Sequence, residues 1–154
     1  MKPKTEIRYS IIYNKMFNEN FSREDMKKLK EDCKKFEEFY KEHINKVILL
    51  IEKHHNKKWK YEFIPIYIVK NVPNSFSDPL TLKYFKNEKI MFIILAHELL
   101  HNNFVGKYKF ENSEELHKYM QPILDRIIEE LDLGVEKELK IFNEKTTNLS
   151  RRNS

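Results

Sequence analysis

The sequence predicts an α+β fold with a long N-terminal helix, a small sheet with an edge strand, a buried helix that carries an H-E-x-x-H motif, and a further helix near the C-terminus. Apolar residues recur every three or four positions in two segments, and short runs rich in β-branched and aromatic residues lie between them. Residues 90–96 form an unbroken apolar run directly before the motif. Because 154 residues with 40% hydrophobic side chains suffice for one core, we assign residues 1–140 to a single domain and residues 141–154 to a polar C-terminal tail.

Composition limits the location and the partners of the chain. The net charge of +5 and the pI near 9.1 permit weak attraction to nucleic acid, although lysine-rich surfaces are more often only solvated. The single cysteine, Cys33, excludes an internal disulfide, and no early apolar stretch resembles a signal peptide. The longest apolar runs, residues 47–51 and 90–96, are far shorter than the roughly 20 residues that cross a bilayer. We therefore expect a cytoplasmic protein without a membrane segment.

The first third of the chain is predicted to form a strand and a long helix. Residues 6–13 alternate between apolar and polar side chains, as in a half-buried strand. Ser22 with Asp25 three residues on resembles a capping box and predicts a helix start. The apolar spacing that follows predicts a helix over about residues 23–55, which at 1.5 Å per residue would be ~50 Å long. Because a domain of this size is narrower than that, we expect a break or an overhanging end.

Two strands and the motif helix are predicted next. Residues 60–70 favour a strand, in which Pro65 must occupy a place where no ladder donor is needed. Residues 80–85 alternate after a turn and are predicted to form an edge strand. Asn87 can cap a helix from about residue 88 through residue 101 or 102.

A second amphipathic helix is predicted after the motif, in the segment that ends before Gly134. Its apolar stripe consists of Leu116, Met120, Ile123, Ile127 and Leu131. Pro122 lies inside this segment and predicts a kink or a restart of the helix. Gly106 suits the residue that follows the end of the motif helix.

The motif H-E-L-L-H at residues 97–101 predicts a metal site. On a helix, His97 and His101 lie one turn apart on the same face, with about 5–6 Å between Cβ atoms, so both imidazoles can bind one ion. Glu98 lies about 100° further round, where its carboxylate can reach a water molecule at the open position of that ion and act as a general base. The preceding apolar run predicts that these polar groups are buried, which is costly unless a metal and its water satisfy them.

A third metal ligand is expected on the second amphipathic helix. The candidates are Glu111, Glu114, Glu115 and His117. At 100° per residue, His117 lies about 60° from the centre of the apolar stripe, whereas Glu114 and Glu115 lie about 120–140° from it. Since a ligand must point inward toward the motif helix, we predict His97, His101 and His117 as ligands of Zn²⁺. Glu114 is the alternative if the helix begins later or turns differently.

The residues H-E-L-L-H resemble the zinc-binding motif of the zincin metallopeptidases. The metzincin subgroup is excluded, because Phe104 and Lys107 stand where it has a glycine and a third histidine. Peptide deformylases resemble the motif less well, since they take a cysteine ligand and Cys33 lies on the apolar stripe of the long helix. The resemblance covers roughly residues 64–131, and only residues 97–101 are specific.

Small single-domain zincins are the nearest in pattern. Minigluzincins resemble the chain if Glu114 is a ligand, and SprT-like proteases resemble it if His117 is the third histidine. The resemblance implies a zinc-dependent metallopeptidase that acts on peptides or proteins, with Glu98 as catalytic base and acid. It also likens residues 75–85 to the edge strand on which zincins bind an extended peptide.

Other interpretations remain open at this stage. The alternative function is a metal-holding binding module, associated with nucleic acid through its basic surface, whose H-E-x-x-H site is structural or latent. His54 and His55 are interpreted as structural residues near a helix end. A hydrogen-bond donor for developing negative charge should lie opposite the catalytic glutamate, and Tyr84, Tyr108 and Tyr119 are the candidates.

Overall fold

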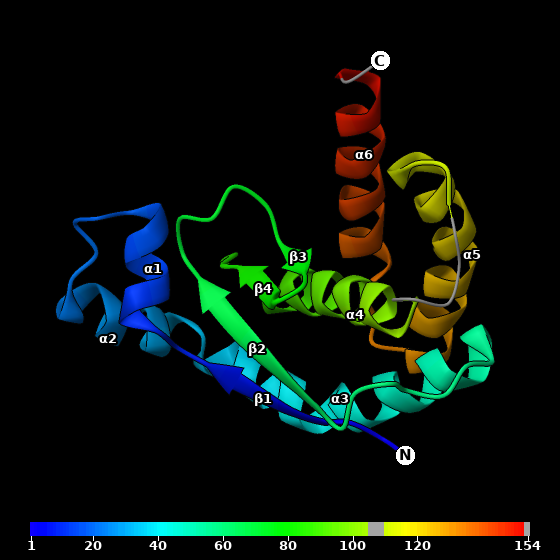
Figure 1. Cartoon of the computed structure of the whole chain (residues 1–154), viewed down its shortest axis with the longest axis horizontal. Coiled ribbons are helices and arrows are strands. Elements are labelled where there is room, and N and C mark those ends of the chain that lie inside the picture. Colours follow the sequence, from blue (N-terminus) through cyan, green and yellow to red (C-terminus); the bar gives the residue numbers. More distant parts are fainter. Residues whose placement is uncertain (105–109, 153–154) are drawn as a thin grey trace.

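The computed structural model describes residues 1–104 and 110–152, and within them it has six helices and a four-stranded mixed sheet (Figure 1). This arrangement confirms the predicted α+β class. The elements in chain order are β1 (Lys4–Arg8), α1 (Ile11–Phe17), α2 (Arg23–Asp32), α3 (Lys34–His55), β2 (Phe63–Val69), β3 (Phe76–Ser77), β4 (Leu80–Lys83), α4 (Glu88–Phe104), α5 (Ser113–Leu131) and α6 (Glu136–Arg152). No helix in the described ranges is long and apolar enough to cross a membrane.

The sheet has the strand order β1-β2-β4-β3. Strands β1, β2 and β4 are parallel, and β3 is antiparallel to β4, with Phe76 opposite Thr81 and Ser77 opposite Leu80. The strands predicted in residues 60–70 and 80–85 are therefore present, but the predicted edge position of the latter is wrong. Strand β4 is paired on both sides, and the edge beside it is β3, whose two residues are too few to show alternation in the sequence.

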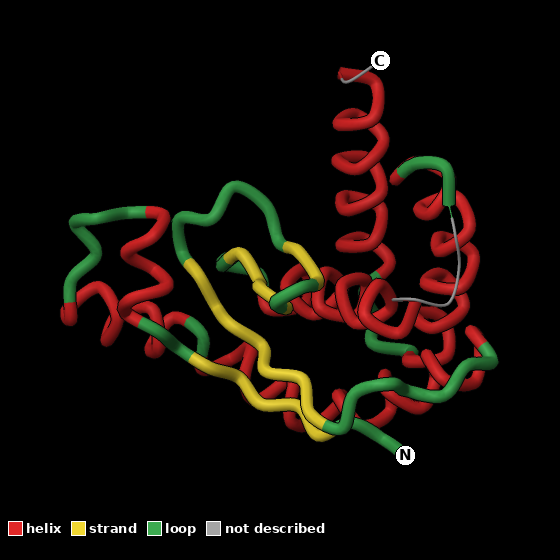
Figure 2. The backbone as a smooth tube through the Cα atoms, viewed as in Figure 1, coloured by secondary structure: helices red, strands yellow, loops and turns green. Residues whose placement is uncertain are grey.

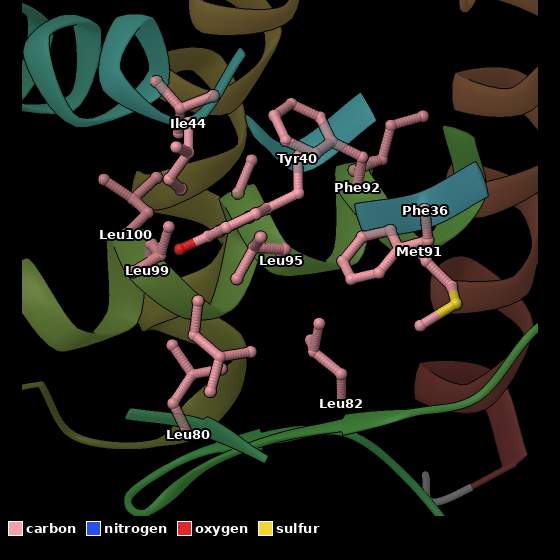
Figure 3. Packing of buried hydrophobic residues seen from close by; sticks show 14 of the residues in the cluster. Phe36, Tyr40, Ile44, Leu80, Leu82, Met91, Phe92, Leu95, Leu99 and Leu100 are labelled. Atoms are coloured by element: carbon pink, nitrogen blue, oxygen red, sulfur yellow. The ribbon is translucent and has the colours of Figure 1, made fainter. Parts of the chain in front are cut away.

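The two faces of the sheet are covered by different helices because side chains alternate along each strand. Figure 3 shows leucines of α4 between Leu80 and Leu82 of β4 on one side and α3 residues, among them Tyr40, on the other. Thr81 points to the opposite face, where its hydroxyl lies 2.7 Å from the Tyr13 hydroxyl of α1. Helix α4 is thus held in the core by α3 and by the sheet.

The N-terminal segment differs from the prediction. Strand β1 ends at Arg8, and the predicted second half of the strand is instead α1, which begins at Ile11. The Ser10 hydroxyl accepts a hydrogen bond from Tyr13 N at 3.1 Å and caps this helix. A helix of seven residues is too short to display its period, so a strand pattern fits the same residues equally well.

The predicted long helix is divided in two, as its length led us to expect. The first helix, α2, begins with the predicted capping box, in which Asp25 N donates to Ser22 Oγ at 3.1 Å and Ser22 N donates to Asp25 Oδ2 at 2.8 Å. The break falls at Cys33, which is fully buried. The second helix, α3, ends before Asn56, a residue in the left-handed conformation with φ of 52°.

The helices that follow the sheet begin and end near the predicted positions. The Asn87 side-chain oxygen accepts hydrogen bonds from the backbone N–H groups of Lys89 and Ile90, both at 3.0 Å, and so caps α4. Helix α5 runs without a restart through Pro122. Gly106 lies outside the described residues, and Gly134, with φ of 60°, lies in the turn between α5 and α6.

The C-terminal segment differs from the polar tail predicted for residues 141–154. Most of it belongs to α6, which begins at Glu136, contacts α4 and projects beyond the other helices in the view of Figure 2. Phe142 is buried, and Asn143 Oδ1 accepts a hydrogen bond from Gln121 Nε2 of α5 at 3.3 Å. The first turns of α6 are therefore part of the core, which its mostly polar sequence does not indicate.

Replacing Leu82 by Ala is expected to lower the free energy of unfolding by about 2–5 kcal/mol, because Leu82 is fully buried between β4 and α4 and its removal leaves a cavity. Denaturant unfolding followed by circular dichroism measures this. The control is Ile12→Ala on α1, where the side chain is 74% exposed and the expected change is within about 0.5 kcal/mol. Equal effects of the two substitutions would contradict the described core.

Candidate metal centre

The H-E-x-x-H motif lies in the C-terminal half of α4, where the helix passes α5 and α6 (Figure 1). Leu99 and Leu100 are fully buried in the core, which fixes the rotation of the helix about its axis. That rotation brings His97 and His101 to the side of α4 that meets α5, while Glu98 lies about 100° away on the same turn. His97 is 9% exposed and Glu98 7% exposed, so the motif is buried, as its apolar surroundings predict.

Three imidazoles meet between α4 and α5. His101 Nε2 lies 3.0 Å from His97 Nε2 and 3.1 Å from His117 Nε2, and the ligand atoms of all three residues lie within 4.8 Å of one another. The rings of His97 and His117 are stacked with an interplanar angle of 3° and centroids 5.3 Å apart. The structure therefore brings together the three residues that the sequence analysis selects as metal ligands.

The orientation of the His117 ring is set by its own helix. His117 Nδ1 donates to the carbonyl oxygen of Ser113, one turn earlier in α5, at 2.7 Å. With the ring proton on Nδ1, the lone pair of Nε2 points toward the other two histidines. A hydrogen bond to the second ring nitrogen is typical of histidines that bind metals, because it selects the tautomer and orients the ring.

The alternative ligand, Glu114, lies elsewhere. Its carboxylate forms an ion pair with Lys118 Nζ at 2.8 Å on the exposed side of α5, and this contact lowers the pKa of the carboxyl group. The Glu115 carboxylate, near the start of the same helix, accepts a hydrogen bond from Glu111 N at 2.7 Å. Neither carboxylate belongs to the group that could hold an ion.

Burial sets the charge state of the cluster. Burial, followed by repulsion from His101 and His117, lowers the pKa of His97 to about 3. Burial and the charge of His117 likewise lower the pKa of His101 to about 4. Both rings are therefore neutral near pH 7 and keep a lone pair, which is the form that binds a metal.

The neighbouring carboxyl group is perturbed in the opposite direction. Burial raises the pKa of Glu98 to about 7. Its side chain takes part in no hydrogen bond recorded for the described residues, whereas the next residue on the same face of α4, Asn102, donates to the carbonyl oxygen of Ser77 in β3 at 2.6 Å. The Glu98 side of the helix thus faces the edge of the sheet, and the histidine side faces α5.

The residues present fit a zinc ion. One nitrogen of His101 lies close to two others, and since a ring nitrogen carries at most one proton, a hydrogen bond can satisfy only one of these contacts. A cation would interact with all three lone pairs at once, and two Zn–N bonds of about 2.1 Å at a tetrahedral angle imply nitrogens roughly 3.4 Å apart. Three histidines with a fourth position left open are the donor set of catalytic rather than structural zinc sites.

Helix α6 supplies a contact that sequence reasoning missed. The Phe142 ring meets the His97 ring edge to face, with centroids 5.6 Å apart. This apolar contact contributes to the burial of His97. Phe142 continues the spacing of Val135 and Leu139, but three apolar residues are too few to distinguish a helix from a tail, so the sequence alone does not indicate this contact.

The other candidates do not join the cluster. His54 Nε2 lies 2.7 Å from Glu130 Oε1, and buried His55 is hydrogen-bonded through Nδ1 to Asn103 Oδ1, which agrees with structural roles for both. Tyr119 packs against the ring of Phe104, about 200° round α5 from His117.

Neither of the other two tyrosines can be placed at the site. Burial raises the pKa of Tyr84, and the groups that raise it further are Asp32 and Cys33 at the α2 to α3 junction, with no histidine among them. Tyr108 lies outside the described residues. An oxyanion donor is therefore not identified among the described residues.

No protein-family model, curated protein or solved structure matches the chain.

Proposed function

We propose that the protein is a zinc-dependent metallopeptidase. The observation that supports this most strongly is the meeting of three Nε2 atoms from His97, His101 and His117 beside a buried carboxyl group, that of Glu98. A purely structural zinc site is closed by four protein ligands, whereas three neutral imidazoles leave one position for water or substrate.

The roles of the residues follow from this proposal. A zinc ion held by the three histidines would supply a Lewis acid that polarises a peptide carbonyl and lowers the pKa of a water molecule. Glu98 accepts a proton from the attacking water as the oxygen bonds to the carbonyl carbon. It then delivers that proton to the amide nitrogen as the C–N bond breaks, so that a carboxylic acid and an amine are released, and the acid passes its proton to the amine or to solvent at neutral pH. A carboxyl pKa near 7 suits a group that must both take and give a proton at neutral pH.

The sheet edge supports a peptide as the substrate. Among the residues that the structure describes, strand β3 is paired with β4 alone and contacts α4, so its other side offers backbone groups close to the helix that carries Glu98. An extended chain can bind such an edge through main-chain hydrogen bonds, which impose little sequence preference. We therefore propose unfolded or flexible protein segments as the class of substrate.

The purified protein is expected to bind one zinc ion per chain and to cleave an unfolded protein such as casein. Zinc at 100 times its dissociation constant should stabilise the fold by about 2.7 kcal/mol, which for a chain of this length raises Tm by about 5–10 °C. Metal content, thermal unfolding and casein cleavage are measured before and after chelation and after zinc is restored. Absence of zinc binding would refute the proposal.

Zinc binding without cleavage would instead favour the metal-holding module. That module should also bind DNA, with an affinity that falls steeply between about 50 and 200 mM salt. Four of the described lysines form ion pairs with carboxylates. These pairs are Lys27 with Glu24, Lys34 with Glu31, Lys53 with Glu130 and Lys118 with Glu114.

A further inference from the structure

Two buried asparagines follow the second histidine of the motif, and their side chains make contacts in different parts of the fold. Asn102 is 8% exposed, and its Nδ2 donates to the carbonyl oxygen of Ser77 at 2.6 Å. Asn103 is fully buried, hydrogen-bonded through Oδ1 to Nδ1 of His55, and donates from Nδ2 to the carbonyl oxygen of Lys57 at 3.5 Å. Asn102 thus joins α4 to the sheet, and Asn103 joins it to the end of α3.

The bond from Asn102 matters because β3 has few contacts of its own. The strand has two residues, and within the described ranges 1–104 and 110–152 it pairs with β4 along one side only. Its beginning is held by Lys83 N, which donates to Ser75 Oγ at 2.8 Å. Ser77, at its end, is the residue that Asn102 binds, so this side chain links the sheet edge to α4 in addition to the packing between the two elements.

Asn102, the donor of this hydrogen bond, lies on the same face of α4 as Glu98, the proposed catalytic residue. Asn102 follows Glu98 by four residues, so the two side chains lie one turn apart and about 40° apart round the helix. Asn102 Nδ2 also lies 3.4 Å from the Glu98 carbonyl oxygen. A shift of Ser77 away from α4 would therefore change the position of the strand relative to Glu98.

We propose that Asn102 is a positioning residue that holds the edge strand β3 at the distance from Glu98 and the histidines at which a bound peptide can be hydrolysed. This proposal rests on the proposed function, because it assumes that a peptide binds along β3. Asn102 does not touch the peptide in this scheme. It acts through Ser77, the residue of the strand whose carbonyl oxygen accepts its hydrogen bond.

The test compares Asn102→Ala with Asn103→Ala. Loss of the Asn102 bond is expected to raise the KM for fluorescein-labelled unfolded casein by about 10-fold, the effect of one lost hydrogen bond from a buried donor to the partly buried Ser77 carbonyl, with zinc content unchanged and kcat altered less. Hydrogen exchange of residues 76–83 should become faster. Asn103→Ala is expected to lower the unfolding midpoint and leave KM unchanged, because its partners, His55 and Lys57, lie away from β3.

A merely structural role would give another pattern. If Asn102→Ala lowers kcat in proportion to the folded, zinc-loaded fraction and leaves KM and the exchange of residues 76–83 unchanged, the proposal is overturned. Asn102→Asp is a second variant of the same size, in which a carboxylate oxygen would face the Ser77 carbonyl, and it should raise KM at least as much as the alanine variant.

Binding of the labelled casein in the Glu98→Gln background, measured by fluorescence anisotropy, separates this proposal from the proposed function. If the wild type cleaves nothing but Asn102→Ala still weakens binding in that background about 10-fold, the positioning role stands and the peptidase proposal fails. If the wild type and Glu98→Gln proteins bind no casein, the positioning role is overturned, whether or not zinc is bound.

Discussion

The Glu98→Gln variant is expected to bind zinc with the affinity of the wild type and to lose casein cleavage by a factor of about 100 to 10,000, the range that a positioned acid and base contribute. Glutamine has nearly the same size and shape as glutamate but cannot take up the proton of the attacking water. The fold should not be weakened, because the substitution removes a carboxyl group whose ionisation burial opposes, as its pKa of about 7 indicates. Zinc content and kcat/KM are the two measurements.

Glu114→Gln is the matched control for this variant. Glu114 lies on the exposed side of α5 with Lys118, and since exposed ion pairs contribute little, its activity should stay within about twofold of the wild type. Cleavage that survives in Glu98→Gln would refute the assignment of the general base. Loss of zinc in that variant would place Glu98 among the metal ligands, contrary to its position about 100° from His97 round the helix.

Much of the site can be predicted from the sequence because the spacing of residues within one helix determines their relative positions. His97, Glu98 and His101 are linked by fixed angles within one helix, and the apolar residues before them predict its burial. Other local features were predicted where the sequence carries a strong signal, as for the capping box at Ser22 and Asp25. Such features depend only on residues a few positions apart.

The features that were missed depend on short elements or on distant contacts. Helix α1 has seven residues and is marked mainly by its cap at Ser10, and β3 has two residues. The contact of Phe142 with His97 joins residues 45 positions apart in the chain, a distance over which periodicity carries no information. The interior position of β4 likewise follows from pairing with a strand too short to recognise in the sequence.

The position of His117 lies between these cases, since a helical wheel places it on the inner side of α5 but cannot say what it faces. The structure adds the packing of α5 against α4 and α3, and with it the 3.1 Å separation between His117 Nε2 and His101 Nε2. It also shows why His117 is exposed although it lies on the inner side of α5. The site lies near the start of α5, where Met120 is the first fully covered residue of the stripe.

The His117→Ala variant is therefore expected to lower zinc affinity by at least about 100-fold, since even indirect partners of metal ligands can be worth 10- to 100-fold. The fold without metal should be unchanged, because His117 is exposed and alanine is a good helix former, so a loss of zinc cannot be attributed to unfolding. Competition with a chelator of known affinity measures zinc binding, and circular dichroism verifies the helices. Glu114→Ala is the control and should bind zinc as the wild type does, because its carboxylate is turned toward Lys118. If instead Glu114→Ala loses zinc and His117→Ala retains it, the third ligand is a carboxylate and the three-histidine site is wrong.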